Sequence, residues 1–135
     1  MEKSEKILVV DDEKSIRILL SEVLSGAGFE VSMARDGKES LDQMAGRKFD
    51  LVITDVHMPI LDGIEMLRRM KKAGRREKVI IMTGDPSDER FRDADIPPVV
   101  TRLQKPFRMD NLLNVVVAAM ANGTGECPAG VPSAM

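Results

Sequence analysis

The sequence is poor in aromatic side chains and in the residues that build disulfides and zinc sites. Its 135 residues include four Phe, no Tyr, no Trp, one Cys and one His. Without Tyr or Trp the chain lacks the aromatic platform on which single-stranded bases stack. One Cys cannot form an internal disulfide, and no cluster of His and Cys is available for zinc. The hydrophobic core must therefore consist mainly of Ile, Leu, Val and Met.

The chain also lacks a strong net charge and a long apolar segment. Its formal net charge is −2, so it has no global basic field for nucleic acid or for acidic membranes. The first residues, MEKSEKILVVDDE, reach acidic side chains too early for a signal peptide, and no run is long enough to span a bilayer. We therefore expect a cytoplasmic protein that contacts neither a membrane nor nucleic acid directly.

Short apolar runs alternate with helical patterns along most of the chain. The patterns predict strands at residues 6–10, 30–34, 49–54, 78–82 and 99–103, and helices at 15–27, 37–45, 62–73, 87–94 and 109–121. Such alternation predicts an α/β fold with a parallel sheet covered by helices on both faces. Residues 4–122 are predicted to form this single domain, and the Gly- and Pro-rich residues 123–135 a disordered tail or truncated linker.

Polar side chains gather where the predicted strands end. Asp11 and Asp12 follow the first strand, Asp55 the third, Thr83 the fourth and Lys105 the fifth. Ligands of parallel sheets bind at this edge, so we expect these side chains to lie close together. Three neighbouring carboxylates repel one another, and a hard divalent cation such as Mg²⁺ or Mn²⁺ relieves the repulsion.

The same cluster predicts phosphoryl chemistry at Asp55. Magnesium held by a few carboxylates usually works together with a phosphate, and phosphoryl transfer mainly needs positioning and charge neutralisation. Lys105 offers a compact positive charge and Thr83 a hydroxyl donor, while an Asp can act as the nucleophile. Taken singly, the acidic residues could be helix N-terminal or turn residues; together with Thr83 and Lys105 they favour a phosphoacceptor.

Four short motifs at these strand ends resemble a known family. They are VVDDE (residues 9–13), LVITDVHMPILDG (51–63), IIMTG (80–84) and KPF (105–107). In this order and spacing they resemble the receiver domain of two-component response regulators, over about residues 6–121. The resemblance implies a flavodoxin-like, doubly wound (βα)5 fold. Its five-stranded parallel sheet would have the order 2-1-3-4-5 and be flanked by five helices.

The resemblance also implies a role for each residue of the cluster. Asp55 would accept a phosphoryl group from a sensor histidine kinase or a phosphotransfer protein. Asp12, Asp55 and the backbone carbonyl of His57 would bind Mg²⁺ directly, while Asp11 would act through water. Thr83 and Lys105 would contact the phosphoryl oxygens. A direct metal bond from the His57 imidazole is the less favoured alternative for that residue.

The signalling surface is where the sequence departs from the family. Arg102 stands three residues before Lys105, where relatives carry an aromatic side chain that moves with the phosphorylation-sensitive Thr. The last predicted helix, which includes Leu112 and Val116, is apolar nearly all round. A helix of this kind is buried on more than one side, so we expect it to pack on the sheet and also on a second copy or an output protein.

The resemblance implies a switch in which phosphorylation of Asp55 changes a protein-interaction surface. Two other functions compete with this interpretation. Phosphohydrolases with an aspartate nucleophile carry a second Asp two residues later, where this chain has His57, so we expect no enzyme beyond self-catalysed phosphorylation and dephosphorylation. A constitutive binding module with vestigial phosphorylation stays open. The basic run that includes Arg68, Arg75 and Lys78 is predicted to be a solvated helix face rather than a nucleic-acid site.

Overall fold

The computed structural model describes residues 5–84 and 99–121. Five parallel strands form one sheet in the order β2-β1-β3-β4-β5. The strands are β1 (Lys6–Val10), β2 (Glu30–Ala34), β3 (Leu51–Asp55), β4 (Lys78–Thr83) and β5 (Val99–Gln104). The helices of the described ranges are α1 (Lys14–Gly26), α2 (Gly37–Gly46), α3 (Gly63–Lys72) and α5 (Met109–Ala121). The predicted α/β class and strand order are confirmed, while the predicted helix 87–94 and tail 123–135 lie outside the described residues.

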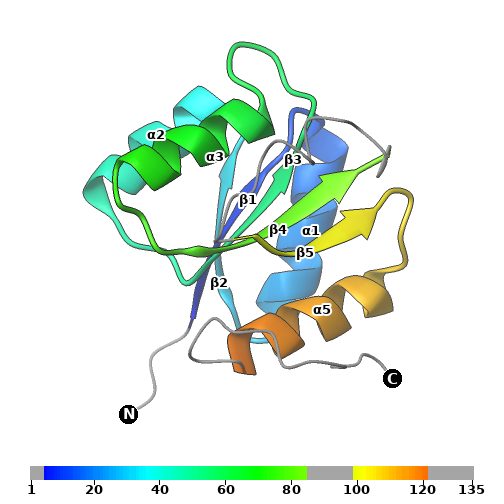
Figure 1. The fold of residues 1–135 in the computed structure, drawn as a ribbon. Coiled ribbons are helices and arrows are strands. Elements are labelled where there is room, and N and C mark those ends of the chain that lie inside the picture. Colours follow the sequence, from blue (N-terminus) through cyan, green and yellow to red (C-terminus); the bar gives the residue numbers. More distant parts are fainter. Residues whose placement is uncertain (1–4, 85–98, 122–135) are drawn as a thin grey trace.

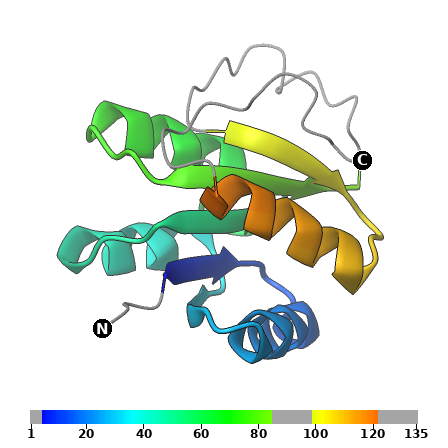
Figure 2. The ribbon, with the colours of Figure 1, turned by 90° about the horizontal axis from the view of Figure 1, so that it is seen from below.

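The helices cover both faces of the sheet. In Figure 1, α2 and α3 lie on one face and α1 and α5 on the other. Figure 2 shows the same division from below. Two hydrophobic clusters fill the spaces between sheet and helices, and alternate residues of β1, β3 and β4 point into them. In β1, for example, Leu8 and Val10 pack toward α2 and α3, whereas Ile7 and Val9 pack toward α1 and α5.

The central strand β3 is buried along its whole length. Its side chains pack into both clusters, which explains why no charged residue interrupts the run LVIT before Asp55. The strand begins at Leu51 rather than at residue 49 and includes Asp55 as its last residue. The phosphoacceptor candidate is therefore held by the sheet itself, since Asp55 pairs with Met82 of β4.

Helix α1 exposes two large apolar side chains. Leu20 and Leu24 are buried, but Leu19 is 41% exposed and Ile18 is 42% exposed. In the sequence, the helical spacing of Leu19 with Leu20 and Leu24 predicts that Leu19 faces the core; this prediction is wrong. The helix packs on the sheet through a narrow stripe, because Leu20 and Leu24 are one turn apart and Leu19 points away from that line.

The basic run after α3 is not uniformly solvated. Arg75 donates hydrogen bonds to the carbonyls of Met44 and Arg47, each at 2.8 Å, and pairs with the buried Glu77. Lys78 donates to the carbonyl of Ala119 at 2.7 Å. The prediction of a solvated face is thus wrong for Arg75 and Lys78, because carbonyls from distant parts of the chain need donors there. In the part of the chain that the structure describes, no helix is long and apolar enough to cross a membrane.

Candidate functional site

Three carboxylates meet at the carboxyl edge of the sheet. Asp11 and Asp12 follow β1, Asp55 ends β3, and one oxygen of each lies within 4.8 Å of the others. Asp11 is fully buried, Asp55 is 8% exposed and Asp12 is exposed. The predicted meeting of these residues is confirmed. An oxygen-only donor set with one solvent-facing member fits Mg²⁺ or Mn²⁺ and does not fit zinc.

Lys105, which directly follows β5 at the same edge of the sheet, bridges two of the carboxylates. Its Nζ lies 3.0 Å from Oδ2 of Asp11 and 3.3 Å from Oδ2 of Asp55. Its backbone N–H donates to the Thr83 carbonyl at 2.7 Å, which ties the loop after β5 to the end of β4. Burial of the ammonium opposes its charge, but the hydrogen bond to Asp11 and the charges of Asp11 and Asp55 outweigh it and raise the pKa of Lys105. The amine therefore stays charged beside the acids at neutral pH.

The carboxyl of Asp55 is less acidic than an exposed aspartate. Burial is the main influence that raises the pKa of Asp55 above its ordinary value of 3.8, and the negative charge of Asp11 adds to it. The charge of Lys105 and the hydrogen bond from the Val56 N–H to Oδ1, at 2.8 Å, act in the opposite direction without cancelling the rise. Ionised Asp55 therefore carries an unrelieved electrostatic cost in the folded protein.

Neutralising Asp55 is expected to stabilise the metal-free protein. Because the pKa of Asp55 is higher in the folded than in the unfolded chain, stability is lost as the pH rises from 3.8 through the raised folded value. At pH 7 we expect Asp55→Asn to melt a few degrees higher, corresponding to about 1 kcal/mol in a domain of this size. The gain should disappear below pH 3.8, where Asp55 is protonated in both states.

Thermal melts at pH 7 and at acidic pH, in EDTA, measure this effect. The control is Asp42→Asn, which changes an exposed carboxylate on α2 paired only with Lys38. Its melting temperature should hardly move, since exposed ion pairs contribute little. A lower melting temperature for Asp55→Asn than for the unaltered protein at pH 7 would contradict the expectation.

Asp11 is held by four hydrogen bonds that come from separate parts of the chain. Its N–H donates to the Ala34 carbonyl at 3.1 Å, and its Oδ1 accepts from the Glu13 N–H at 2.9 Å. Its carbonyl accepts from Arg17 Nη1 at 2.7 Å, and its Oδ2 accepts from Lys105. Sequence reasoning missed Arg17, which looked like an ordinary helix residue; only the bend of the chain after β1 shows its role.

The loop after β3 passes close against the backbone of Asp55. The N–H of Gly63 donates to the Val56 carbonyl at 2.8 Å, and a Cβ at Gly63 would lie 2.3 Å from the Asp55 carbonyl oxygen. The Thr54 hydroxyl donates to that same oxygen at 2.8 Å. Glycine is therefore required at position 63 because the start of α3 must approach Asp55 closely.

The remaining predicted site residues lie around this centre. Thr83 is fully buried at the end of β4 and pairs with Gln104 of β5. His57 is exposed in the loop after β3, and its imidazole is not part of the carboxylate group. A metal bond from its backbone carbonyl stays a prediction. In the same loop Ile60 has φ 69° and is 77% exposed.

The residues predicted for the output surface lie in two different environments. Arg102 is exposed on β5. Leu112 and Val116 are fully buried between α5 and the sheet, so any part they take in switching must go through core packing. The outward side of α5 carries Val117, which is 54% exposed. Whether a partner covers this side stays a prediction.

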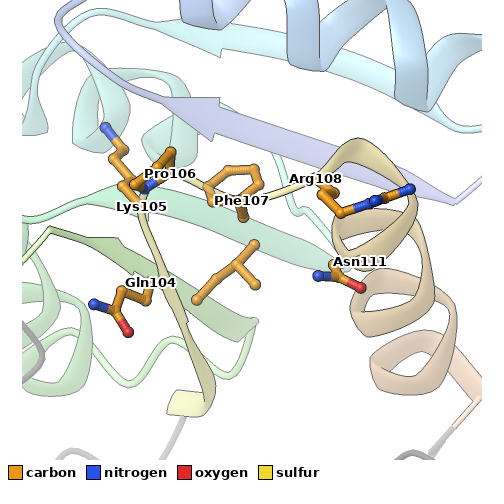
Figure 3. A pocket seen from close by; sticks show the side chains of 7 residues that line it. Gln104, Lys105, Pro106, Phe107, Arg108 and Asn111 are labelled. Atoms are coloured by element: carbon orange, nitrogen blue, oxygen red, sulfur yellow. The ribbon is translucent and has the colours of Figure 1, made fainter.

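A pocket of about 550 Å³ lies between the end of β5 and the first turn of α5. Its lining consists of Leu103, Gln104, Lys105, Pro106, Phe107, Arg108 and Asn111. Figure 3 shows the Lys105 side chain pointing away from Asn111, on the opposite side of the loop. Lys105 thus borders the pocket and also contacts Asp11 and Asp55.

Comparison with known proteins gives one consistent result. The family model of the response regulator receiver domain matches residues 7–117. The chain is 38% identical over 113 residues to sporulation initiation phosphotransferase F of Bacillus subtilis, covering 84% of this chain and 91% of that protein. It is 38% identical over 114 residues to the transcriptional regulatory protein FixJ of Bradyrhizobium diazoefficiens, but this match covers 84% of this chain and only 56% of FixJ.

A solved structure agrees with these sequence matches. The response regulator TrrA of Thermotoga maritima, solved in complex with Mg²⁺–BeF, superposes with a TM-score of 0.71 and 35% identity. The superposition covers 84% of this chain and 96% of TrrA. The sheet order, the carboxylate cluster and Lys105 are thus found in a chain whose sequence matches the receiver model over most of its length. The chain belongs to the response regulator receiver family of two-component systems.

Proposed function

We propose that this protein is a phosphorylation switch in which Asp55 accepts a phosphoryl group with the help of Mg²⁺. The supporting observation is the placement of Asp55 at the end of β3, with Asp11, Asp12 and the Lys105 ammonium around its carboxylate. Three acids and one lysine leave the cluster with excess negative charge. A divalent cation held by these carboxylates would balance that charge and would favour the approach of an anionic phosphoryl group.

Each residue has a defined part in the proposed transfer. Asp12, Asp55 and the His57 carbonyl would hold the metal, and Asp11 would act through water. An Asp55 oxygen attacks the phosphorus of a phosphohistidine on a sensor kinase or phosphotransfer protein. The P–N bond breaks and its electron pair returns to the imidazole, which takes up a proton. Lys105 and Thr83 then bind the phosphoryl oxygens, since Thr83 ends β4 and Lys105 follows β5 at the same edge of the sheet.

The proposed output runs from these two residues to the β5–α5 side of the domain. A phosphoryl group on Asp55 adds charge that draws the Lys105 ammonium from Asp11 toward the new oxygens. The loop that carries Lys105 also forms a wall of the pocket beside α5. Arg102, Leu112 and Val116 belong to the two elements that flank this loop. We expect a second copy of the chain or an output protein to respond to the change there.

Labelling with acetyl phosphate tests the proposal without a partner protein. The protein should gain the mass of one phosphoryl group in the presence of Mg²⁺. Labelling should become at least about tenfold slower in EDTA, because the chelator removes the cation that would neutralise the carboxylates and the phosphoryl oxygens. Asp55→Asn should abolish the label, while Asp42→Asn on the surface of α2 should be labelled normally.

Two outcomes would count against a switch at Asp55. One is an unlabelled protein under conditions that label a known receiver domain. The other is a label that persists in Asp55→Asn at the level of the unaltered protein. Sedimentation with and without beryllofluoride then separates a switch from a constitutive binding module, because only a switch changes its association when Asp55 is occupied.

A further inference from the structure

Arg17 is the residue of α1 that reaches back to the acidic cluster. Its Nη1 donates to the Asp11 carbonyl at 2.7 Å, and the side chain is half-buried. Within the described residues, no hydrogen bond or ion pair joins Arg17 to a carboxylate; its partner is a backbone oxygen. This is unusual for a guanidinium placed next to several acids, whose carboxylates are the stronger acceptors.

The oxygen that Arg17 binds belongs to the peptide bond between Asp11 and Asp12. The Asp11 side chain has its own anchors, since Oδ1 accepts from the Glu13 N–H and Oδ2 from Lys105. Asp12 is exposed, so the position of its carboxylate depends mainly on the position of its backbone. Fixing the plane of that peptide bond therefore fixes the position of the Asp12 Cα and limits where the Asp12 carboxylate can reach.

We propose that Arg17 is a positioning residue for the metal site, an inference that rests on the proposed magnesium-dependent function. Arg17 holds the Asp11–Asp12 peptide so that the two neighbouring acids face Asp55 instead of turning into solvent. The α1 helix supplies the rigidity, because Arg17 lies in its first turns and its N–H is bonded to the Glu13 carbonyl at 3.1 Å.

The charge of Arg17 and its positioning role predict opposite changes in Mg²⁺ affinity when the residue is replaced, which makes the inference testable. A cation near a magnesium site repels the metal, so removing the guanidinium should tighten binding if charge alone mattered. If Arg17 positions Asp12, removing it should weaken binding. We expect Arg17→Met, which keeps the length of the stem, to bind Mg²⁺ about tenfold more weakly.

Calorimetric titration with Mg²⁺, repeated with Mn²⁺ followed by electron paramagnetic resonance, measures this affinity directly. Arg17→Lys keeps a donor of similar reach and should recover most of it. Arg69→Met is the matched control, because Arg69 is an exposed arginine on α3 paired with Glu65. Labelling by acetyl phosphate in Arg17→Met should be slow at limiting Mg²⁺ and return to within about twofold at saturating Mg²⁺, as expected for lost metal affinity alone.

The outcomes separate this inference from the proposed function. If the unaltered protein binds no Mg²⁺ and takes no label, the proposed function fails. If it binds and is labelled, but Arg17→Met has equal or tighter Mg²⁺ affinity, only the role of Arg17 is wrong. A lower melting temperature with unchanged affinity would show a purely structural contact. Should Arg17→Met fail to fold, Arg17→Lys and Arg17→Gln decide, because a positioning role predicts weaker binding in the glutamine variant than in the lysine variant.

Discussion

Arg75→Met should lower the stability of the domain by about 3–5 kcal/mol, the usual cost of leaving a buried charge without its partner. Glu77 is 6% exposed, and its carboxylate accepts from Arg75 Nε at 3.1 Å and from Arg75 Nη2. Without the guanidinium it keeps only the Phe49 N–H, at 3.2 Å. The carbonyls of Met44 and Arg47 lose their donor as well.

Thermal and urea melts check this expectation, and a drop of roughly 10–15 °C corresponds to the expected free energy. The double variant Arg75→Met/Glu77→Met should regain much of the loss, because it removes the stranded charge together with its partner. A single variant within about 1 kcal/mol of the unaltered protein would show that water compensates the carboxylate. Arg76→Met, at the exposed neighbouring position, is the matched control and should be nearly neutral.

Gly63→Ala should damage both the stability and the chemistry at Asp55. The new Cβ would meet the Asp55 carbonyl oxygen at 2.3 Å and the Val56 Cα at 3.1 Å, and neither backbone atom can rotate away. Either α3 retreats from the sheet or the end of β3 shifts. We expect a loss of about 2–3 kcal/mol, the upper part of the range for overpacking.

The same substitution should slow labelling of Asp55 by acetyl phosphate by up to about 100-fold, since small misplacements of reacting groups have effects of this size. Gly26→Ala provides the control. Gly26 is the last residue of α1, and a Cβ there meets nothing within 4 Å. That variant should be labelled normally and be as stable or up to about 1 kcal/mol more stable. Normal labelling of Gly63→Ala at saturating Mg²⁺ would contradict the proposed link between α3 and Asp55.

The sequence was informative where a local pattern and a global rule agree. Runs such as KILVV and LVIT are typical of strands buried on both faces. Parallel strands bring Asp11, Asp55 and Lys105 to one edge whatever their separation along the chain. The fold and the carboxylate cluster were therefore predictable. The strand order came from the family resemblance, since periodicity alone does not choose between neighbours.

Contacts between side chains and backbone carbonyls were not predictable in this way. Arg17, Arg75 and Lys78 each bind a carbonyl from another part of the chain, and a carbonyl has no sequence signature. The burial of Leu19 was also predicted wrongly, for a different reason. Its spacing fits an inward helix face, but the contact with the sheet is narrower than the apolar stripe, and only the packed structure shows which residue is left out.

Lys105 contacts the carboxylates of Asp11 and Asp55 and also lines the pocket beside α5. Thermodynamic linkage makes any coupling through this residue reciprocal. A partner that binds tenfold tighter at the pocket when Asp55 is phosphorylated must, by the same factor, favour the phosphorylated state over the unphosphorylated one, which is about 1.4 kcal/mol. The receiver and its target would then set each other's equilibrium, so the abundance of the target becomes part of the signal.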